Sequence, residues 1–266
     1  MPFTHAFLEL VGNGKLRKEE SLVADCLKER GIPVSFYTVK RIRRRQLPLQ
    51  ADTFVMGDLD AMHGAMKQLG IEIPPVDTYP KSLKPFLRRE IRRTTLGELE
   101  QRLHGRYSAN VFAKPAQRSK RFTGRVFSSP SDLYFVGNTS RKEPIWCSEV
   151  VDWTSEFRVY VIDGAPVSID CYAGNPNAEL DLGVVHEALA EFQKNGAPVA
   201  YGIDFGILDR DETALIEYND GFSLGAYQIP KEPYTDLLWR RWEELVFSIT
   251  STPKRQAEDR PPSSSS

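Results

Sequence analysis

Cysteine is scarce in this chain of 266 residues, which contains three cysteines, Cys26, Cys147 and Cys171. Three scattered cysteines do not make a disulfide framework, and their spacing is not that of a metal site. This usage indicates a reducing compartment, and we expect the cytoplasm. The first residues lack the basic start and long apolar region of a secretory signal. No stretch reaches the roughly 18 apolar residues of a membrane span.

The chain also lacks an excess of charge of either sign. Its 35 Lys and Arg residues and 36 Asp and Glu residues give a formal net charge of −1. This balance predicts neither a nucleic acid nor an anionic membrane as partner. The basic residues are nevertheless grouped, as KRIRRR at 40–45, RREIRR at 88–93 and RSKRFTGR at 118–125. The first two groups are either solvated faces or receivers of an acidic substrate.

Two familiar kinds of site are missing as well. The segment VGNGKL at Val11–Leu16 has two glycines and a lysine, but not the G-x-x-x-x-G-K-[ST] spacing of a P-loop. The four histidines are scattered, with no pairing that suggests a metal site or a catalytic triad. Any nucleotide site in this chain is therefore built differently.

Hydrophobic periodicity predicts an α+β chain in two parts followed by a tail. Residues 1–78 read β-α-β-β-α-β and predict a small α/β domain, residues 79–250 form the second domain, and residues 251–266 are a Pro/Ser-rich tail expected to be disordered. The predicted strands are Ala6–Val11, Val34–Val39, Thr53–Gly57, Gly70–Ile73, Val111–Lys114, Phe135–Val136, Pro144–Val151, Glu156–Ile162, Ala165–Tyr172, Tyr201–Leu208 and Thr213–Tyr218. The predicted helices are Lys18–Glu29, Asp58–Leu69, Ser82–Leu103, Leu180–Asn195 and Tyr234–Ile249.

The most informative stretch is YGIDFGILDRDETALIEYNDG, two apolar β-rich runs around a polar turn. Folded as a hairpin, it holds Asp204 near Glu217 and Asn219, because residues i and i+2 of a strand point the same way. These are hard oxygen ligands suited to one or two Mg²⁺ ions that carry phosphates. The alternative is a turn-flanking aspartate and an edge-strand glutamate that meet solvent. The apolar surroundings favour the metal site, because a buried carboxylate is costly unless it is paired.

A second stretch, FAKPAQRSKRFTGRVF, ends an apolar strand in Lys114 before Pro115 stops it. Lys114 would reach the α- and β-phosphates of a nucleotide. The loop that follows carries Lys120 and Arg121, whose charges would stabilise the group being transferred. The alternative is a basic hairpin exposed to solvent.

The third stretch is PIWCSEVVDWTSEFRVYVI, a crossover between two strands. Glu149, Val150 and Val151 would hold an adenine edge, and Glu156 would hold ribose hydroxyls. Ordinary strand-terminal charge explains the two glutamates as well. Arg158 faces the same side of its strand as Glu156, and would contact phosphate or an acyl-phosphate. A structural ion pair with Glu156 or Asp170 competes with that role.

The stretch NDGFSLGAYQI follows the predicted metal strand. Its small residues, Ser223 and Gly225 among them, allow close approach of a substrate to the backbone. A plain loop leading into the last helix is the competing interpretation.

Taken together, the order Lys114, basic loop, Ser148–Val151, Glu156, Asp204, Glu217 and Asn219 resembles the ATP-grasp superfamily over about Tyr79–Phe247. Within it, the chain is similar to a little-characterised clade from bacteria and phages. The resemblance implies an ATP-grasp fold, in which two α/β lobes sandwich ATP after a small N-terminal domain. It also implies ATP and one or two Mg²⁺ as cofactors, with Lys114 and Lys120 on phosphates, Glu149–Val151 on adenine, Glu156 on ribose and Asp204, Glu217 and Asn219 on metal.

Two departures from the family pattern affect the site. The upstream phosphate lysine is ambiguous, with Lys81 and Lys84 as candidates. No arginine directly precedes the first metal ligand, and Arg158 is the proposed substitute.

The resemblance implies an ATP-dependent ligase that activates a carboxylate as an acyl-phosphate and joins it to an amine or thiol. The carboxylate would belong to a small molecule, a peptide or a protein. Catalysis would involve Lys114, Arg158, Lys120 and Arg121, with Ser223 and Gly225 near the substrate. A phosphotransferase and a non-catalytic nucleotide-binding module are the alternatives.

Overall fold

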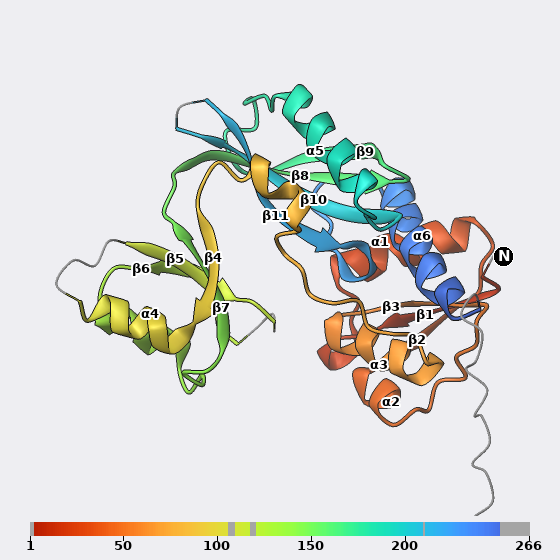
Figure 1. Cartoon of the computed structure of the whole chain (residues 1–266). Helices are drawn as coiled ribbons and strands as arrows, with labels where there is room; N and C mark the ends of the chain where they lie inside the picture. Colours follow the sequence, from red (N-terminus) through yellow and green to blue (C-terminus); the bar gives the residue numbers. More distant parts are fainter. Residues whose placement is uncertain (1–2, 106–109, 118–120, 210, 251–266) are drawn as a thin grey trace, which may run out of the picture.

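The structure is a computed structural model that describes residues 3–105, 110–117, 121–209 and 211–250. The predicted disordered tail and Lys120 therefore lie outside the described residues. Three sheets organise the chain: an N-terminal sheet, a central sheet and a C-terminal sheet (Figure 1). Helix makes up 36% and strand 30%, which confirms the α+β class.

The N-terminal sheet is parallel and has the order β2-β1-β3. Its strands are β1 (His5–Glu9), β2 (Val34–Tyr37) and β3 (Thr53–Met56), and the helices of this part are α1 (Lys18–Glu29), α2 (Val39–Arg43) and α3 (Leu59–Leu69), with a short 3₁₀ turn η1 at Gly12–Gly14. The helix α2 was missed in the sequence, where the basic run hides the one buried residue, Ile42.

The predicted strand Gly70–Ile73 is wrong. Gly70 ends α3 in the left-handed conformation, at a φ of 74°, which glycine adopts without a steric penalty. Ile71 then returns its backbone N–H to Met66 and buries its side chain in the core, with 4% exposed. Burial of this apolar residue therefore needs no fourth strand.

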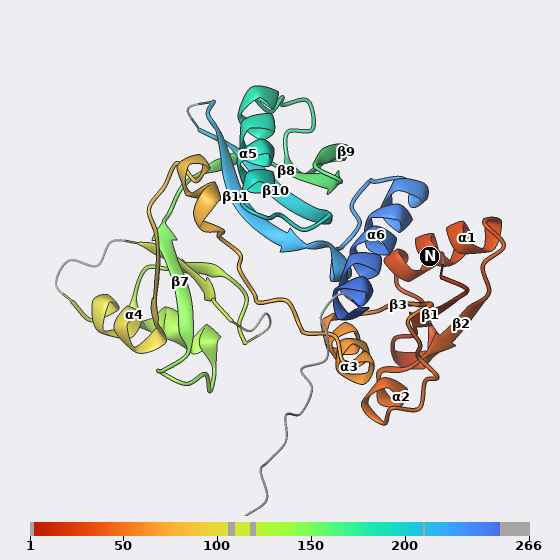
Figure 2. The same cartoon turned by 45° about the vertical axis from the view of Figure 1, so that its right-hand side comes forward.

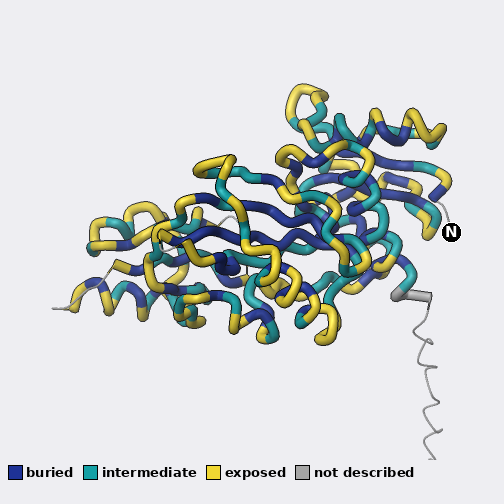
Figure 3. The backbone as a smooth tube through the Cα atoms, turned by 90° about the horizontal axis from the view of Figure 1, so that it is seen from above, coloured by how far each residue is buried: buried dark blue, intermediate teal, exposed yellow. Residues whose placement is uncertain are grey.

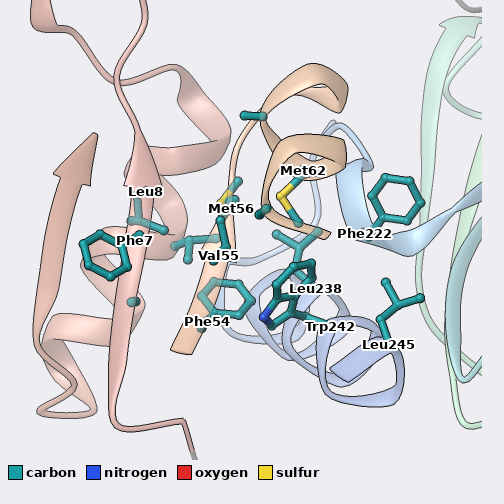
Figure 4. Close-up of a cluster of buried hydrophobic side chains, with 14 of the residues drawn as sticks. Phe7, Leu8, Phe54, Val55, Met56, Met62, Phe222, Leu238, Trp242 and Leu245 are labelled. Atoms are coloured by element: carbon teal, nitrogen blue, oxygen red, sulfur yellow. The ribbon is translucent and has the colours of Figure 1, made fainter. Parts of the chain in front are cut away.

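Helix α6 (Lys231–Thr250) covers the N-terminal sheet and shares its core (Figure 4). Trp242 is fully buried, and its indole N–H donates to the carbonyl of Thr53 at 2.9 Å. Phe54 and Trp239 stack with ring centroids 5.3 Å apart. The N-terminal part thus completes its core with a helix from near the end of the sequence.

The central sheet is antiparallel, with the order β4-β7-β5-β6. Its strands are β4 (Ile91–Thr95), β5 (Val111–Pro115), β6 (Arg125–Phe127) and β7 (Pro144–Glu149), with helix α4 (Leu96–Leu103) and the 3₁₀ turns η2 (Lys81–Phe86) and η3 (Pro130–Val136). One face packs on α4 through Val111, Ala113 and Cys147.

Two predictions for this region are wrong. The single helix at Ser82–Leu103 is instead η2, β4 and α4, because Pro85 interrupts the first turn and Ile91–Thr95 pairs with β7. The predicted strand Phe135–Val136 is the end of η3, whose start is fixed by Pro130 and by a capping box between Ser129 and Asp132.

The C-terminal sheet is also antiparallel, with the order β11-β10-β8-β9. Its elements are β8 (Trp153–Ile162), β9 (Ala165–Gly174), helix α5 (Leu182–Lys194), β10 (Ala200–Leu208), β11 (Thr213–Asp220) and the turn η4 (Gly221–Ser223). Helix α5 covers one face through Val185, Leu189 and Phe192. Burial is concentrated along the strands, as the tube view shows (Figure 3). The opposite face carries Arg158 and Asp204.

The described part of the chain holds no helix that combines the length and the apolar character needed to cross a membrane.

We predict that Trp242→Ala lowers the free energy of unfolding by about 3–5 kcal/mol, because it leaves a cavity and an unpaired Thr53 carbonyl. Urea unfolding measures the loss. Tyr134→Ala is the matched control, because Tyr134 is 84% exposed and its truncation should cost less than about 0.5 kcal/mol. A loss below about 1 kcal/mol for Trp242→Ala would contradict the role given to α6.

Candidate active site

The site is built on the hairpin of β10 and β11, where Asp204 pairs directly with Glu217. Next to this pair the register shifts, so that Phe205 pairs with Leu215 and Ile216 is an extra residue. Without this β-bulge, Glu217 would share the face of Leu215, which is buried under α5. The bulge turns Glu217 to the face of Asp204. It therefore creates the acidic pair.

Arg158 lies on β8 directly opposite Asp204. Its guanidinium donates to both carboxylate oxygens, from Nε at 2.8 Å and from Nη2 at 2.7 Å. Only 9% of the Arg158 side chain and 3% of the Asp204 side chain are exposed. Burial raises the pKa of Asp204 to about 6, and Arg158 limits that rise. The ion-pair alternative for Arg158 is thus realised, but with Asp204 and not with Glu156 or Asp170.

Lys114 and Asn219 complete the cluster around Glu217. Lys114 Nζ donates to Glu217 Oε2, and Asn219 Nδ2 lies 3.1 Å from Glu217 Oε1 and 3.4 Å from Asp204 Oδ2. Burial opposes ionisation of Glu217, but Lys114 and Asn219 outweigh it and hold the pKa of that carboxyl below its ordinary value. Burial also opposes the charge of Lys114, yet Glu217 raises its pKa. Both groups of this pair are therefore charged.

These residues fit a Mg²⁺ ion as a donor set. Asp204, Glu217 and Asn219 offer two carboxylates and one amide oxygen within mutual contact, which are the ligand types that Mg²⁺ selects. Among the described residues no group of three or more His, Cys, Asp or Glu side chains is suited to a metal. The amide of Asn219 is accordingly part of the proposed set, and phosphate oxygens and water would supply the rest.

The predicted adenine and ribose residues lie apart from the charged cluster. Glu149 and Val150 line a cavity of about 750 Å³ with Arg92, Arg102 and Cys147. Cys147 faces α4, whereas its neighbour Trp146 pairs with Lys114. The Glu149 side chain is therefore not among those around Lys114. Val151 is half-buried between β7 and β8.

Glu156 is held at its sheet by Tyr172. The Tyr172 hydroxyl donates to Glu156 Oε2 at 2.9 Å. Burial raises the pKa of Tyr172, so its proton is retained for this bond. Glu156 and Arg158 are two residues apart on β8, which places Glu156 one step along the sheet from the Arg158–Asp204 pair.

A strap of residues 224–228 crosses the sheet beyond Arg158. Tyr160 donates to the carbonyl of Gly225 at 3.2 Å and accepts from the N–H of Tyr227 at 2.9 Å. Asp170 accepts from the N–H of Gln228 at 2.7 Å. Lys18 of α1 donates to the carbonyl of Tyr227. Side chains from two strands and one helix therefore fix the strap beside the cluster.

The predicted substrate residues Ser223 and Gly225 line a cavity of about 540 Å³ together with Lys114, Arg158 and Glu217. The Ser223 hydroxyl donates to the carbonyl of Gly57 at 3.3 Å. Residues 221–225, GFSLG, also match G-x-S-x-G, the pattern of a hydrolase nucleophile elbow. That elbow requires a strand–turn–helix, whereas here β11 leads into a single 3₁₀ turn and then an extended Leu224.

The remaining predicted cations are less closely placed. Lys120 lies outside the described residues. Arg121 is exposed and does not line the 540 Å³ cavity. Lys81 and Lys84 lie on η2, away from the residues that line this cavity.

Three residues near the cluster were missed in the sequence. Arg89 donates to the carbonyls of Leu215 and Ile216 at 2.7 and 2.9 Å, which ties the central part to β11 at its bulge. Tyr227 stacks on Tyr172, with ring centroids 4.6 Å apart, and lies 4.9 Å from the Arg158 guanidinium. Tyr79 lies under the Lys114 ammonium, 4.5 Å from the ring centroid. In the sequence Arg89 is one member of a basic run, and no spacing pattern marks either tyrosine.

We predict that Arg158→Met lowers the free energy of unfolding by about 3–5 kcal/mol, because it leaves Asp204 buried without its partner. The double variant Arg158→Met/Asp204→Leu should recover most of that loss, since no buried charge is left. Urea unfolding measures all variants. Arg240→Met is the control, because its ion pairs are exposed and should contribute less than about 1 kcal/mol. A double variant no more stable than the single one would argue against this account.

Comparison with solved structures places the fold. An L-amino acid ligase from Bacillus licheniformis superposes with a TM-score of 0.59 at 13% identity, covering 92% of this chain and 76% of that chain. The macrocyclase MdnC from Microcystis aeruginosa MRC, bound with its precursor peptide MdnA, gives 0.54 at 10% identity, covering 91% and 99%. D-alanine–D-alanine ligase from Bacillus anthracis gives 0.52 at 14% identity, covering 92% and 98%. At these identities the similarity is one of fold.

A search of curated protein sequences finds no match. A family model of the ATP-grasp domain, the second family of its clade, matches residues 86–237, which is more than half of the chain. The matched segment contains Lys114, Arg158, Asp204, Glu217 and Asn219. The chain therefore belongs to this family of ATP-grasp domains.

Proposed function

We propose that this protein is an ATP- and Mg²⁺-dependent ligase that joins a carboxylate to an amine or thiol through an acyl-phosphate. The observation that carries the proposal is the cluster of Arg158, Asp204, Glu217, Asn219 and Lys114 at one cavity in an ATP-grasp chain. Two cations and two carboxylates meet there at the junction of the central and C-terminal sheets.

The nucleotide would extend along β8. Its adenine would lie at the crossover of Glu149, Val150 and Val151, where backbone groups are available, and its ribose at Glu156. Its phosphates would then reach Lys114 and Arg158. The related D-alanine–D-alanine ligase structure has also been solved as a complex with ATP. Lys120 and Arg121 would add positive charge from the loop after β5.

Asp204, Glu217 and Asn219 would hold one or two Mg²⁺ ions, which supply positive charge against the phosphate oxygens and polarise the γ-phosphoryl group. The chain's own contribution is positional. Arg158 is fixed in the plane of Asp204 by two hydrogen bonds, with its Nη1 3.5 Å from the carbonyl of Gly225. A guanidinium held in this way stabilises charge that develops during transfer without having to reorganise.

In the proposed reaction, a carboxylate oxygen of the substrate attacks the γ-phosphorus and ADP leaves. The nitrogen or sulfur nucleophile then attacks the acyl carbon, phosphate leaves, and the nucleophile loses its proton. Arg158 and Lys114 would neutralise the oxygens in both steps. The strap, with Ser223 and Gly225, would hold the acyl group next to Arg158.

The cavity of about 540 Å³ has room for a carboxylate-bearing small molecule or a peptide or protein end, with walls from Leu59, Val76, Phe122 and Phe222. The macrocyclase of similar fold was solved with a precursor peptide, and the L-amino acid ligase is named for amino acids. Both kinds of acceptor are therefore included in the proposal.

We predict that a non-hydrolysable ATP analogue binds in a magnesium-dependent way and that Glu217→Gln weakens this binding at least about tenfold, because one charged ligand is lost. Isothermal titration calorimetry with and without Mg²⁺ measures the affinity. Asp209→Asn, in the exposed turn of the same hairpin, is the matched control and should bind like the wild type. Equal binding by Glu217→Gln and the wild type would remove the metal assignment.

The products distinguish a ligase from a phosphotransferase. With pools of carboxylates and amines or thiols, we expect ADP and free phosphate to form in equal amounts and only when both substrates are present. Enzyme-coupled ADP and phosphate assays measure the two products. ADP formed with a phosphorylated product and no free phosphate would identify a phosphotransferase instead. Nucleotide binding without turnover across the pools would favour a non-catalytic module.

A further inference from the structure

The segment between α3 and η2 passes from the N-terminal part to the two other sheets, beside β11 (Figure 2). Thr78 and Tyr79 lie near its end and come before the segment matched to the family, residues 86–237. We infer that Tyr79 is a positioning residue for Lys114, holding the ammonium at the phosphate end of the cleft. This inference rests on the proposed function of Lys114.

The Tyr79 ring lies directly against the Lys114 ammonium. Lys114 Nζ is 4.5 Å from the centroid of the ring, and only 14% of the Lys114 side chain is exposed. An ammonium so far removed from water needs compensating interactions. Besides the carboxylate of Glu217, the electron-rich face of Tyr79 provides one.

The ring is itself fixed by a second aromatic residue. Tyr79 packs edge-on against Trp146, with ring centroids 5.2 Å apart and planes at 87°. Trp146 pairs with Lys114 across β7 and β5, so both side chains leave the same face of the central sheet. Tyr79 therefore closes a contact among three residues, two aromatic rings and one cation.

The backbone of the same segment is attached to the metal-binding strand. The carbonyl of Thr78 accepts from the N–H of Tyr218 at 3.1 Å. Tyr218 is the residue between Glu217 and Asn219. The segment is thus joined to β11 at the metal-binding candidates through its backbone and to the central sheet through the Tyr79 ring. It sets the distance between Lys114 and that strand.

Tyr79 and Glu217 hold Lys114 in different ways. Glu217 engages an N–H donor of the ammonium, the same kind of donor that a phosphate oxygen requires. An aromatic face attracts the charge while leaving the ammonium's hydrogen-bonding capacity largely free. Tyr79 can therefore keep Lys114 in place while its donors turn to phosphate.

The test is a double-mutant cycle with a Mg²⁺-bound, non-hydrolysable ATP analogue as the probe. Tyr79→Phe keeps the ring and should bind within about twofold of the wild type. Tyr79→Leu, and the isosteric replacement of Tyr79 by pentafluorophenylalanine, should weaken binding about tenfold. In the Lys114→Met background, Tyr79→Leu should have little further effect, because the partner is already gone. The fluorinated ring keeps the volume, so this variant remains informative if Tyr79→Leu folds poorly.

A second measurement does not depend on nucleotide. Acetylation of Lys114 by an N-hydroxysuccinimide ester at fixed pH, mapped by mass spectrometry, should rise severalfold in Tyr79→Leu and in the fluorinated variant. Exposed Lys84 is the internal reference. Unchanged Lys114 labelling, or equal losses of affinity in the wild-type and Lys114→Met backgrounds, would overturn the inference. Absence of analogue binding by the wild type would count against the proposed function, and the labelling would still decide the role of Tyr79.

Discussion

The buried ion pair of Arg158 and Asp204 is the interaction on which the site depends. Two charges removed from water are costly, and good geometry with further hydrogen bonds is what makes such a pair tolerable. Here both guanidinium–carboxylate bonds are short, and Asn219 adds a contact to the same carboxylate. The pair crosses from β8 to β10 in the middle of the sheet. It thereby fixes the side-chain layer to which the other charged groups belong.

The cluster is balanced in charge, and this balance explains why it fits a doubly charged metal with a polyphosphate. Asp204 faces Arg158, and Glu217 faces Lys114. Under the proposed function, the metal adds positive charge beside the carboxylates and the phosphates add negative charge beside the cations. Each internal pair gains an external partner of the sign it can accept. The charges of site and ligand are complementary residue by residue.

Much of this cluster was predictable from the sequence, because its members lie in strands with strong apolar patterns. Asp204, Glu217 and Asn219 were expected on one hairpin face, and the structure brings them together with Arg158 and Lys114. The bulge at Ile216 was not predictable, since it depends on which residues of β11 pack under α5. Tyr79 and Arg89 were missed because their roles arise from contacts with strands far along the chain. The false helix at Ser82–Leu103 has the same origin: pairing of β4 with β7 outweighs local helical spacing.

The packing of α6 against the N-terminal sheet bears on how the protein is made. Trp242 bonds to Thr53, 189 residues earlier in the chain. Protein domains commonly fold in order during synthesis, the N-terminal one first. Here the first sheet emerges from the ribosome long before the helix that covers it, so its apolar face stays open while most of the polypeptide is translated. Chaperone demand should therefore be greatest for this early segment, and the moment of release should coincide with the closing of the first core.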